Sequence, residues 1–470
     1  MSADESRGAG GRRKLEQRLQ NAAWERADAA AMRALQWSKL KPLLEKTWAV
    51  NEFYREHWRE AGIDDIARID SLEAFRAKIP TVEKKHFVAD QDSCPPFGKR
   101  LEYVRKNGKH FQVFMTSGTT GQGQELHAET TEEQDGTAAV YAFMHRWAGM
   151  EPGEHALLTM SLTMMAGGRL EYLGATRYGL TVSPIGNYDV HRKLELLRRF
   201  KPAAIIGTTS YFGHMAAVSP DHPPVTGLKA LFGGGEGAGL AWYKRIEAEW
   251  QTPIFDRYGS TQSRNDHMFS CEHGVGEDGR PGMLHNIEPY VLAEVIDPDT
   301  GRHAADGEHG EIVLTCLYHT DTPLIRCRMR DVAIYHEGRY CRCGRPFGGI
   351  EVGSVSRSDD MHRVKGVNIW PQAVDDLLFG IPEIDEYLVH LVTGPSGADE
   401  GTVRVMPKET ASIPDTGAFA EQVREQLRRR VGVRFNIELV PLGTLPRSEY
   451  KARRWKDERA YKAGTPANRK

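Results

Sequence analysis

The middle of the 470-residue chain alternates short apolar runs with amphipathic segments, and this alternation limits the possible folds more than any other feature. Apolar runs recur between residues 156 and 259, and the segments 191–200 and 240–250 between them have apolar residues at helical spacing. Strand-like runs that alternate with helices are typical of a layered α/β domain. We therefore predict that this part of the chain forms a sheet covered by helices.

The segments on either side of this region carry different patterns. Residues 14–62 have apolar residues near helical spacing, with Pro42 near a break. The chain after Pro281 has strand-like runs separated by Gly, Asp and Pro, which predicts a strand-rich subdomain. The remaining residues read as a small α+β unit. The predicted organisation is a disordered tail over residues 1–12, a large N-terminal domain over residues 13–358 and a small C-terminal domain over residues 359–470.

Charge and hydropathy exclude several classes of function. Lys and Arg number 62 against 64 Asp and Glu, and this balance selects neither for nucleic acid nor for an anionic membrane. No run of about 18 apolar residues occurs, and residues 1–20 lack an apolar core, so we expect no spanning helix, no secretory signal and a cytoplasmic location. Six cysteines in such a chain do not form a disulfide scaffold, so the pair Cys341 and Cys343 suggests a metal or chemistry.

A stretch rich in Gly, Ser and Thr, "FMTSGTTGQGQELHAETT" at residues 114–131, has the composition of a phosphate-binding loop. Glycines bring backbone amides against a ligand, and hydroxyls supply neutral donors. A Walker loop needs a Lys and then a helix after its last Gly, but Gln122 and a strand-like "ELHAET" follow here. A helix is expected only from Thr131, which fits a capping box with Gln134. The stretch is a phosphate loop of another kind, or a simple turn.

Two further stretches place small residues after a predicted strand. In "LKALFGGGEGAGLAWYKRIEAEW", residues 228–250, a glycine cluster lies between a strand and an amphipathic helix, and counting from Gly233 puts Ala238 at the last position of a dinucleotide fingerprint. A close strand-to-helix connection explains the same pattern. In "IFDRYGSTQSRND", residues 254–266, a strand ends at Tyr258 before a Gly and hydroxyl residues, which indicates either a ligand pocket beyond the strand ends or a surface turn.

These stretches occur in order before "LIRCRMRDVAIYHEGRYCRCGR", "SRSDDMHRVKGVNIWPQAV" and "LPRSEYKARR". In this combination the sequence resembles the adenylate-forming superfamily of acyl-CoA synthetases and adenylation domains, and is most similar to phenylacetate-CoA ligases. The similarity runs from residue 43 to the region of Lys451. The resemblance implies a large adenylate-forming domain, layered α/β with a β-rich part, and a small mobile domain. It also implies an enzyme that uses ATP, Mg²⁺ and CoA to convert a carboxylic acid, preferably aromatic, into acyl-AMP and then a thioester.

The same resemblance assigns roles to individual residues. Lys451 takes the place of the lysine that serves adenylation, Asp359 that of the interdomain hinge, and Asp331 and Arg357 those of the ribose-side residues. The remaining residues of the ATP and AMP site fall into the phosphate loop, the adenine-side turn and the adenine-packing strand: Ser117, Gly118, Thr119, Thr120 and Gly121; Gly235, Glu236 and Gly237; Tyr258, Gly259, Ser260, Thr261 and Gln262.

Three positions depart from the family pattern. Gln262 stands where the family has a glutamate that helps to bind Mg²⁺, and an amide is a weaker ligand for a hard cation. Tyr450 replaces the glycine before the catalytic lysine, and Met329 replaces a threonine between two arginines. These departures leave open another acceptor or nucleophile, such as a carrier-protein thiol, an amine, or nitrite in diazo formation. A nicotinamide-dependent oxidoreductase or a non-catalytic binding protein would leave most of the motifs unexplained.

Cysteine and histidine residues in the strand-rich region suggest a metal site. Cys341 and Cys343, with Cys271 and either His273 or His285, supply four ligands for tetrahedral zinc. Some relatives that this sequence resembles carry a structural zinc here, and His285 falls where they place their histidine, so we favour His285 over His273. The alternative is a pair of free thiols on a β-turn.

The acid-binding pocket is expected from family position to draw on two segments. Met164 and Met165 in the first, and Tyr211 and Phe212 in the second, could pack against an apolar acid, although core packing explains them equally well. The expected partners are therefore the acid, ATP and CoA, with no nucleic acid or membrane. A homodimer is compatible with the sequence, which does not fix the oligomeric state.

Overall fold

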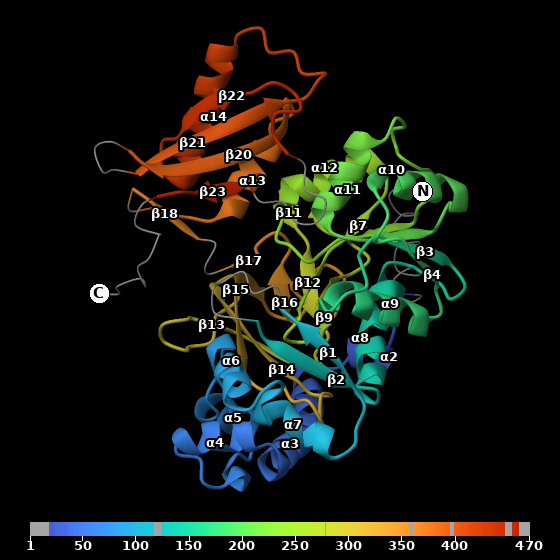
Figure 1. Cartoon of the computed structure of the whole chain (residues 1–470), viewed down its shortest axis with the longest axis vertical. Coiled ribbons are helices and arrows are strands. Elements are labelled where there is room, and N and C mark those ends of the chain that lie inside the picture. Colours follow the sequence, from blue (N-terminus) through green and yellow to red (C-terminus); the bar gives the residue numbers. More distant parts are fainter. Residues whose placement is uncertain are drawn as a thin grey trace, which may run out of the picture.

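The computed structural model describes residues 18–116, 124–277, 279–357, 361–365, 367–394, 399–446 and 454–459. Figure 1 shows four regions in space: N-terminal helices at the bottom, a β-rich sheet in the middle, a helix-covered sheet at the upper right and the C-terminal unit at the upper left. The predicted tail over residues 1–12 and the predicted domain boundary at residues 358–359 lie outside the described residues. The division into domains at that boundary stays a prediction.

The described part of the chain begins with a group of helices. Its longest member, α3 (Ala29–Val50), is capped by Asp28, whose side chain accepts a hydrogen bond from the Ala31 amide. The expected break near Pro42 is wrong, because α3 continues through this residue. The other helical elements of this group are α2 (Ala22–Glu25), α4 (Glu52–Glu60), η1 (Ile66–Arg68), α5 (Leu72–Lys78), α6 (Lys84–Ser93) and α7 (Gly98–Lys106).

The glycine-rich stretch connects an antiparallel hairpin. Strand β1 (Phe111–Met115) pairs with β2 (Leu126–Thr130), as expected for "ELHAET", and α8 (Glu133–Trp147) follows. The predicted capping pair Thr131 and Gln134 is wrong by one residue. Thr130 and Glu133 bond reciprocally instead: the Thr130 amide donates to Glu133 Oε2 over 2.9 Å, and the Glu133 amide donates to Thr130 Oγ1 over 3.4 Å.

The alternating region forms the predicted layered α/β unit. Its sheet has five parallel strands in the order β4 (Thr181–Pro184), β3 (His155–Leu158), β5 (Ala204–Ile206), β6 (Ala230–Phe232) and β7 (Ile254–Phe255). Parallel neighbours require crossover connections, which the amphipathic segments supply. The connecting helices are α9 (Ala166–Tyr178), α10 (Val190–Phe200), α11 (Thr209–Val218) and α12 (Leu240–Trp250).

The strand-rich region after the parallel sheet is an eight-stranded sheet with antiparallel pairing. Its main path runs β13 (Val291–Ile296), β14 (His309–Cys316), β15 (Cys327–His336), β16 (Gly349–Glu351), β12 (Met283–Asn286), β9 (Asn265–Ser270) and β8 (Arg257–Ser260), and β17 (Ser356–Arg357) pairs with β15. A short hairpin joins β10 (Gly276–Glu277) to β11 (Arg280–Pro281). The strand-rich subdomain begins earlier in the chain than predicted, because β8 and β9 precede Pro281.

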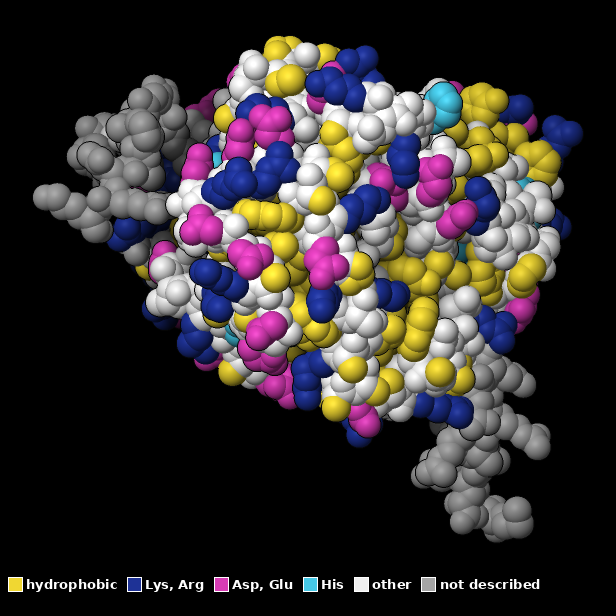
Figure 2. Space-filling model, turned by 90° about the horizontal axis from the view of Figure 1, so that it is seen from below, with side chains coloured by type: hydrophobic (Ala, Val, Ile, Leu, Met, Phe, Trp, Pro, Cys, Tyr) yellow, Lys and Arg dark blue, Asp and Glu magenta, His cyan; other side chains and the backbone are white. Residues whose placement is uncertain are grey.

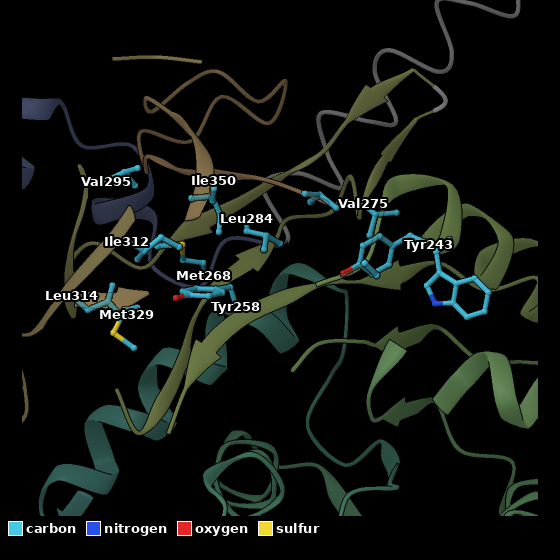
Figure 3. Close-up of a cluster of buried hydrophobic side chains, with 14 of the residues drawn as sticks. Tyr243, Tyr258, Met268, Val275, Leu284, Val295, Ile312, Leu314, Met329 and Ile350 are labelled. Atoms are coloured by element: carbon cyan, nitrogen blue, oxygen red, sulfur yellow. The ribbon is translucent and has the colours of Figure 1, made fainter. Parts of the chain in front are cut away.

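The β-rich and parallel sheets share one hydrophobic core. Figure 3 follows buried side chains from Leu314 and Met329 in the β-rich sheet, past Met268 and Tyr258, to Tyr243 on α12. These side chains are almost completely removed from water, and burial of each large one contributes roughly 2 kcal/mol. Strand β8 ends the path of the β-rich sheet and directly follows β7 of the parallel sheet, so this core fixes the point where the two sheets join.

The C-terminal residues form the predicted small α+β unit. Strands β20 (Ile384–Thr393) and β21 (Asp399–Pro407) are antiparallel, and β22 (Asn436–Leu439) and β23 (Trp455–Asp457) join them on either side in parallel. Helices α13 (Pro371–Phe379) and α14 (Thr416–Val431) pack against each other, and β18 (His362–Val364) pairs with β19 (Val367–Ile369).

The surface agrees with the balanced composition. On the face in Figure 2, Lys and Arg side chains are interspersed with Asp and Glu around several hydrophobic patches, and neither charge dominates. No helix within the described ranges has both the length and the apolar character needed to cross a bilayer.

Candidate active site

The carboxyl ends of the central parallel strands meet at Arg257, at the start of β8. Its Nη1 donates to Gly233 O after β6 over 2.7 Å, and its Nη2 donates to Gly207 O after β5 over 3.3 Å. The guanidinium also forms ion pairs with the buried Glu171 and, over 2.9 Å, with Asp266 Oδ2. These contacts bring the "GGEG" and "RYGSTQ" stretches together at the edge of the sheet where ligands of open α/β folds bind.

Three of the predicted nucleotide-site residues are in direct contact. Tyr258 Oη donates to Asp331 Oδ2 over 2.8 Å, and Asp331 Oδ1 lies 3.4 Å from Arg357 Nη1. Asp331 and Arg357 are also register partners of β15 and β17. Burial raises the pKa of Tyr258 well above its usual value, so the phenol stays protonated and donates to the carboxylate. The arrangement offers one anion and one cation beside an aromatic ring.

The "GGEG" turn brings exposed backbone against the small C-terminal unit. Gly235 has φ +76°, a conformation that favours glycine, and nothing would crowd a Cβ there. At Gly237 a Cβ would lie 2.5 Å from Val355 O and 2.9 Å from Gln372 Nε2 on α13. The Glu236 carboxylate accepts bonds from the amide and, over 3.0 Å, from the hydroxyl of Ser210, near the start of α11. Glu236 therefore fixes the turn. Gly235 leaves the backbone on one side of Glu236 accessible, and Gly237 allows close packing on the other side.

A buried polar cluster links the hairpin to the turn after β8. Gln262 Nε2 donates to Glu125 Oε1 over 3.1 Å, His127 Nε2 lies 3.1 Å from Glu125 Oε2, and Lys84 Nζ lies 3.7 Å from Oε1. Burial lowers the pKa of His127 to about 4, so the ring is neutral near pH 7. Burial alone would raise the pKa of Glu125. The hydrogen bond from His127 and the charges of Lys84 and Arg100 outweigh this effect and lower the pKa below its usual value, so the carboxyl is ionised.

The remaining residues of the predicted "RYGSTQ" motif also lie at this turn. Gly259 and Ser260 end β8, and the Ser260 amide donates to Ser263 Oγ over 3.2 Å, which closes the turn that carries Thr261 and Gln262. All four motif residues after Tyr258 are partly exposed. They are therefore accessible to a ligand.

The small unit contacts the large one next to these elements. Arg245 on α12 pairs with Asp385 over 2.7 Å, and the Trp242 and Phe379 rings lie 4.4 Å apart. Arg454 lies over both rings, at 5.1 and 4.7 Å from their centroids, and makes two bonds of 2.7 and 3.0 Å to Glu386. A cation held between aromatic rings and a carboxylate is a strong, directional anchor.

Several predicted site residues lie outside the described ranges. These are the phosphate-loop residues Ser117, Gly118, Thr119, Thr120 and Gly121, the hinge residue Asp359 and the catalytic Lys451. Their roles stay predictions. The flanking residues are described: Thr116 and Glu125 on either side of the loop, and Arg454 three residues after Lys451.

The predicted acid-pocket residues separate into two groups. Met164 and Met165, just before α9, are 44 % and 37 % exposed, and the Met164 carbonyl accepts a bond from the Met115 amide at the end of β1. Phe212 is fully buried, and its ring packs on Trp250. Tyr211 is almost fully buried, with the Lys193 ammonium 4.5 Å from its ring centre. The methionines are available to a ligand, whereas the aromatic pair contributes to the core.

Four metal-ligand side chains converge at the predicted zinc position. The ligand atoms of Cys271, His285, Cys341 and Cys343 all lie within 4.8 Å of one another, and all six cysteines of the chain are free. Cys271 Sγ lies 3.7 Å from Cys341 Sγ, and Cys343 Sγ lies 3.4 Å from His285 Nε2. The structure therefore selects His285 for this cluster. His273 instead accepts a bond from Arg342 Nε over 2.9 Å.

The sequence patterns did not reveal two of these features. Glu125 lies just before β2, and the alternation of Glu125, His127 and Glu129 along this segment was the available signal. Arg454 belonged to a run of charges that is typical of a solvated surface. Its partners lie elsewhere in the chain, so the sequence offered no local sign of its burial.

Comparisons with known proteins agree with this geometry. The family model described as "AMP-binding enzyme" matches residues 63–315, and the model described as "AMP-binding enzyme C-terminal domain" matches residues 366–459. The phenylacetate-coenzyme A ligase of Escherichia coli is 27 % identical over 438 residues, which cover 91 % of this chain and 95 % of that protein.

Solved structures of one relative add information on conformation. The crystal structure of 2-hydroxyisobutyryl-CoA ligase in the postadenylation state, in complex with R3-HIB-AMP, has a TM-score of 0.81 at 26 % identity, with 94 % of this chain and 92 % of that chain covered. The same ligase in the thioesterification state, in complex with 2-HIB-AMP and CoA, has a TM-score of 0.64 at 27 % identity, with 95 % and 93 % covered. The predicted adenylate-forming fold and the predicted AMP-forming acid–CoA ligase are thereby confirmed, and the chain belongs to the AMP-binding enzyme family.

Proposed function

We propose that this chain activates an aromatic or otherwise apolar carboxylic acid with ATP, releases pyrophosphate, and transfers the acyl group from acyl-AMP to CoA. The observation that carries the proposal is the contact between Tyr258, Asp331 and Arg357 beside the carboxyl ends of the parallel strands. An aromatic ring, a carboxylate and a guanidinium at one point suit a nucleoside, whose base stacks and whose hydroxyls donate to an anion. The similarity to phenylacetate-coenzyme A ligases along nearly the whole chain supports the aromatic acid.

The reaction requires positive charge around the phosphates. A carboxylate attacks the α-phosphorus of ATP, and the bond from that phosphorus to pyrophosphate breaks, so negative charge accumulates where two anions meet. The assignment of Lys451 to this step is supported by Arg454, because three residues of chain span at most about 10 Å and Arg454 is anchored beside α12. Mg²⁺ bound with the nucleotide supplies further charge.

The arrangement of the two units is more similar to the postadenylation state of 2-hydroxyisobutyryl-CoA ligase than to its thioesterification state. Coverage and identity are almost equal in the two comparisons with 2-hydroxyisobutyryl-CoA ligase, so the difference between the TM-scores of 0.81 and 0.64 reflects conformation. We infer that the Arg454 and Asp385 contacts stabilise this postadenylation-like arrangement. Rotation of the small unit for thioester formation would break both.

The test of the proposed function separates the two half-reactions. The first measurement is acid-dependent exchange of labelled pyrophosphate into ATP with arylacetic, benzoic, short aliphatic and hydroxy acids, and the second is thioester formation with CoA. We expect the fastest exchange with an aryl acid and thioester from the same acid. Exchange without thioester would indicate a different acceptor, and exchange that is fastest with a small hydroxy acid would contradict the aromatic assignment.

The proposed nucleotide site predicts a selective effect of Asp331→Asn. The amide keeps an acceptor for Tyr258 but removes the charge, and a hydrogen bond to a charged group contributes about 1.5–3 kcal/mol. We expect ATP to bind roughly 10-fold to 100-fold more weakly, as measured by calorimetry or by the KM for ATP. Asp299→Asn, an exposed carboxylate near the end of β13, is the control and should bind ATP like the wild type. Equal affinities of Asp331→Asn and wild type would remove Asp331 from the site.

The Cys/His cluster fits a structural zinc ion. Four ligands at about 2.3 Å (sulfur) and 2.0 Å (nitrogen) from a tetrahedral centre place two sulfurs about 3.8 Å apart, and sulfur about 3.5 Å from nitrogen. The observed separations of 3.7 and 3.4 Å agree with these values. His285 Nδ1 also lies 3.2 Å from Phe347 O, and a bond donated there leaves Nε2 as the ligand atom. We propose that Cys271, His285, Cys341 and Cys343 bind zinc.

A further inference from the structure

We propose that Glu125 is the carboxylate with which this chain binds the Mg²⁺ that accompanies ATP, in place of an acidic residue at position 262. The inference rests on the proposed function and adds one metal-binding residue to it. It is based on the contact between Glu125 and Gln262, which joins the hairpin after the glycine-rich stretch to the turn after β8.

Nucleotide chemistry explains why a carboxylate is needed at this turn. Attack on the α-phosphorus needs a divalent cation to neutralise the phosphate oxygens, and Mg²⁺ prefers carboxylate oxygens to amide groups. The turn after β8 contains Ser260, Thr261 and Gln262, none of which carries a charge. The carboxylate that Gln262 contacts is Glu125, with 3.1 Å between Nε2 and Oε1.

The backbone fixes Glu125 at the edge of the candidate nucleotide site. Its amide donates to Thr116 Oγ1 over 3.1 Å, and the Thr116 amide donates to Glu125 O over 3.1 Å, so the two residues face each other across the ends of β1 and β2. Gln91 also accepts a bond from the next amide, that of Leu126, over 2.8 Å. These bonds leave Glu125 little freedom, and its carboxylate stays beside Gln262.

The carboxylate has capacity for a further partner. Oε1 contacts Gln262 and, over 3.7 Å, Lys84, whereas Oε2 contacts His127 over 3.1 Å. Two carboxylate oxygens offer about four acceptor positions. The Lys84 side chain is 18 % exposed and carries its ammonium on a flexible four-carbon stem, so it can move aside or turn toward a phosphate oxygen when a cation arrives.

A purely structural role would apply equally to Glu129, which lies four residues after Glu125, on β2. Glu129 is also fully buried, accepts a bond from Thr137 Oγ1 and lies 3.3 Å from His319 Nε2. The described contacts of Glu129 do not include Gln262 or Lys84. The two carboxylates are therefore alike in burial and lie on the same segment of chain, and they differ in their described contacts with the turn after β8. Glu129→Gln is the matched control for Glu125→Gln.

The experiment measures Mn²⁺, as a probe for Mg²⁺, by electron paramagnetic resonance in the presence of α,β-methylene-ATP. Wild type, Glu125→Gln, Glu129→Gln and the double variant Glu125→Gln/Gln262→Glu are compared, with folding checked by thermal melting. We expect Glu125→Gln to weaken Mn²⁺ binding roughly 10-fold to 100-fold and to shift the Mg²⁺ dependence of pyrophosphate exchange equally. Glu129→Gln should match the wild type, and the double variant should regain most of the affinity.

Three results would overturn the assignment of Glu125. They are Mn²⁺ binding by Glu125→Gln that equals the wild type, an equal loss in Glu129→Gln, or no regain in a folded double variant. The double variant keeps the test decisive if Glu125→Gln alone does not fold. Wild-type protein that binds neither the nucleotide analogue nor Mn²⁺ would overturn the proposed function together with this inference, whereas normal nucleotide binding with unchanged Mn²⁺ affinity overturns the inference alone.

Discussion

Replacing Lys451 with alanine should reduce acid-dependent pyrophosphate exchange by about 100-fold to 1,000-fold, the loss typical for removal of one preorganised group that stabilises transition-state charge. The transition state places an acid and a triphosphate in contact, and a fixed ammonium is stronger there than in water because the closed interface excludes solvent. Thioester formation from supplied acyl-AMP should be retained, because that step does not involve attack on a polyanion.

A second lysine in the same segment is the control. Lys456 on β23 is 58 % exposed and pairs with Glu458 at the surface, so Lys456→Ala should leave both half-reactions unchanged. If Lys451→Ala lowers both half-reactions equally, the small unit does not exchange its contacts between the two steps. The rotation that we infer from the Arg454 anchor would then be incorrect.

The sequence was sufficient for the elements that depend on local pattern. The apolar runs became β3 to β7, and the amphipathic segments became α10 and α12 with nearly the expected bounds. The hydrophobic spacing of a segment depends only on the face that it buries, so a single sequence contains it. The error at Pro42 has a non-local cause, because tertiary packing of α3 outweighs the cost of one proline.

The candidate site was predictable only in part, because its contacts join distant segments. Tyr258 and Asp331 were assigned through the family resemblance, and the structure places them within a hydrogen bond. The anchor at Arg454 could not be predicted, because Trp242 is about two hundred positions away and the local run of charges favours solvent. The role of Glu125 could not be predicted for the same reason. That role depends on its contact with Gln262, and the two residues come together only in the folded chain.

Replacing Cys341 with serine should remove one bound zinc ion per chain and lower the Tm by about 5–10 °C. The reason is the position of the cluster between several elements. Arg345, two residues after Cys343, pairs with Glu25 on α2 over 2.7 Å and with Glu272 over 2.6 Å. Its guanidinium also lies 4.5 Å from the Trp147 ring centre on α8. Loss of the ion would release this loop and weaken the attachment of α2.

Cys94→Ser is the matched control, because Cys94 is a half-buried free cysteine like Cys341 but lies at the end of α6, away from the cluster. It should keep the zinc and the wild-type Tm. Zinc content is measured by mass spectrometry and Tm by calorimetry. Both measurements are repeated on the wild type after treatment with a chelator.

The two possible states of the cluster respond differently to these treatments. Four ligand atoms within 4.8 Å of one another require either a cation or protonated thiols, because unscreened thiolates at this distance repel strongly in a buried region. With a cation present, a chelator should lower the Tm of the wild type to that of Cys341→Ser and leave Cys341→Ser unchanged. With protonated thiols, a chelator should change neither protein, and Cys341→Ser should resemble Cys94→Ser, which would end the zinc proposal while leaving the nucleotide site intact.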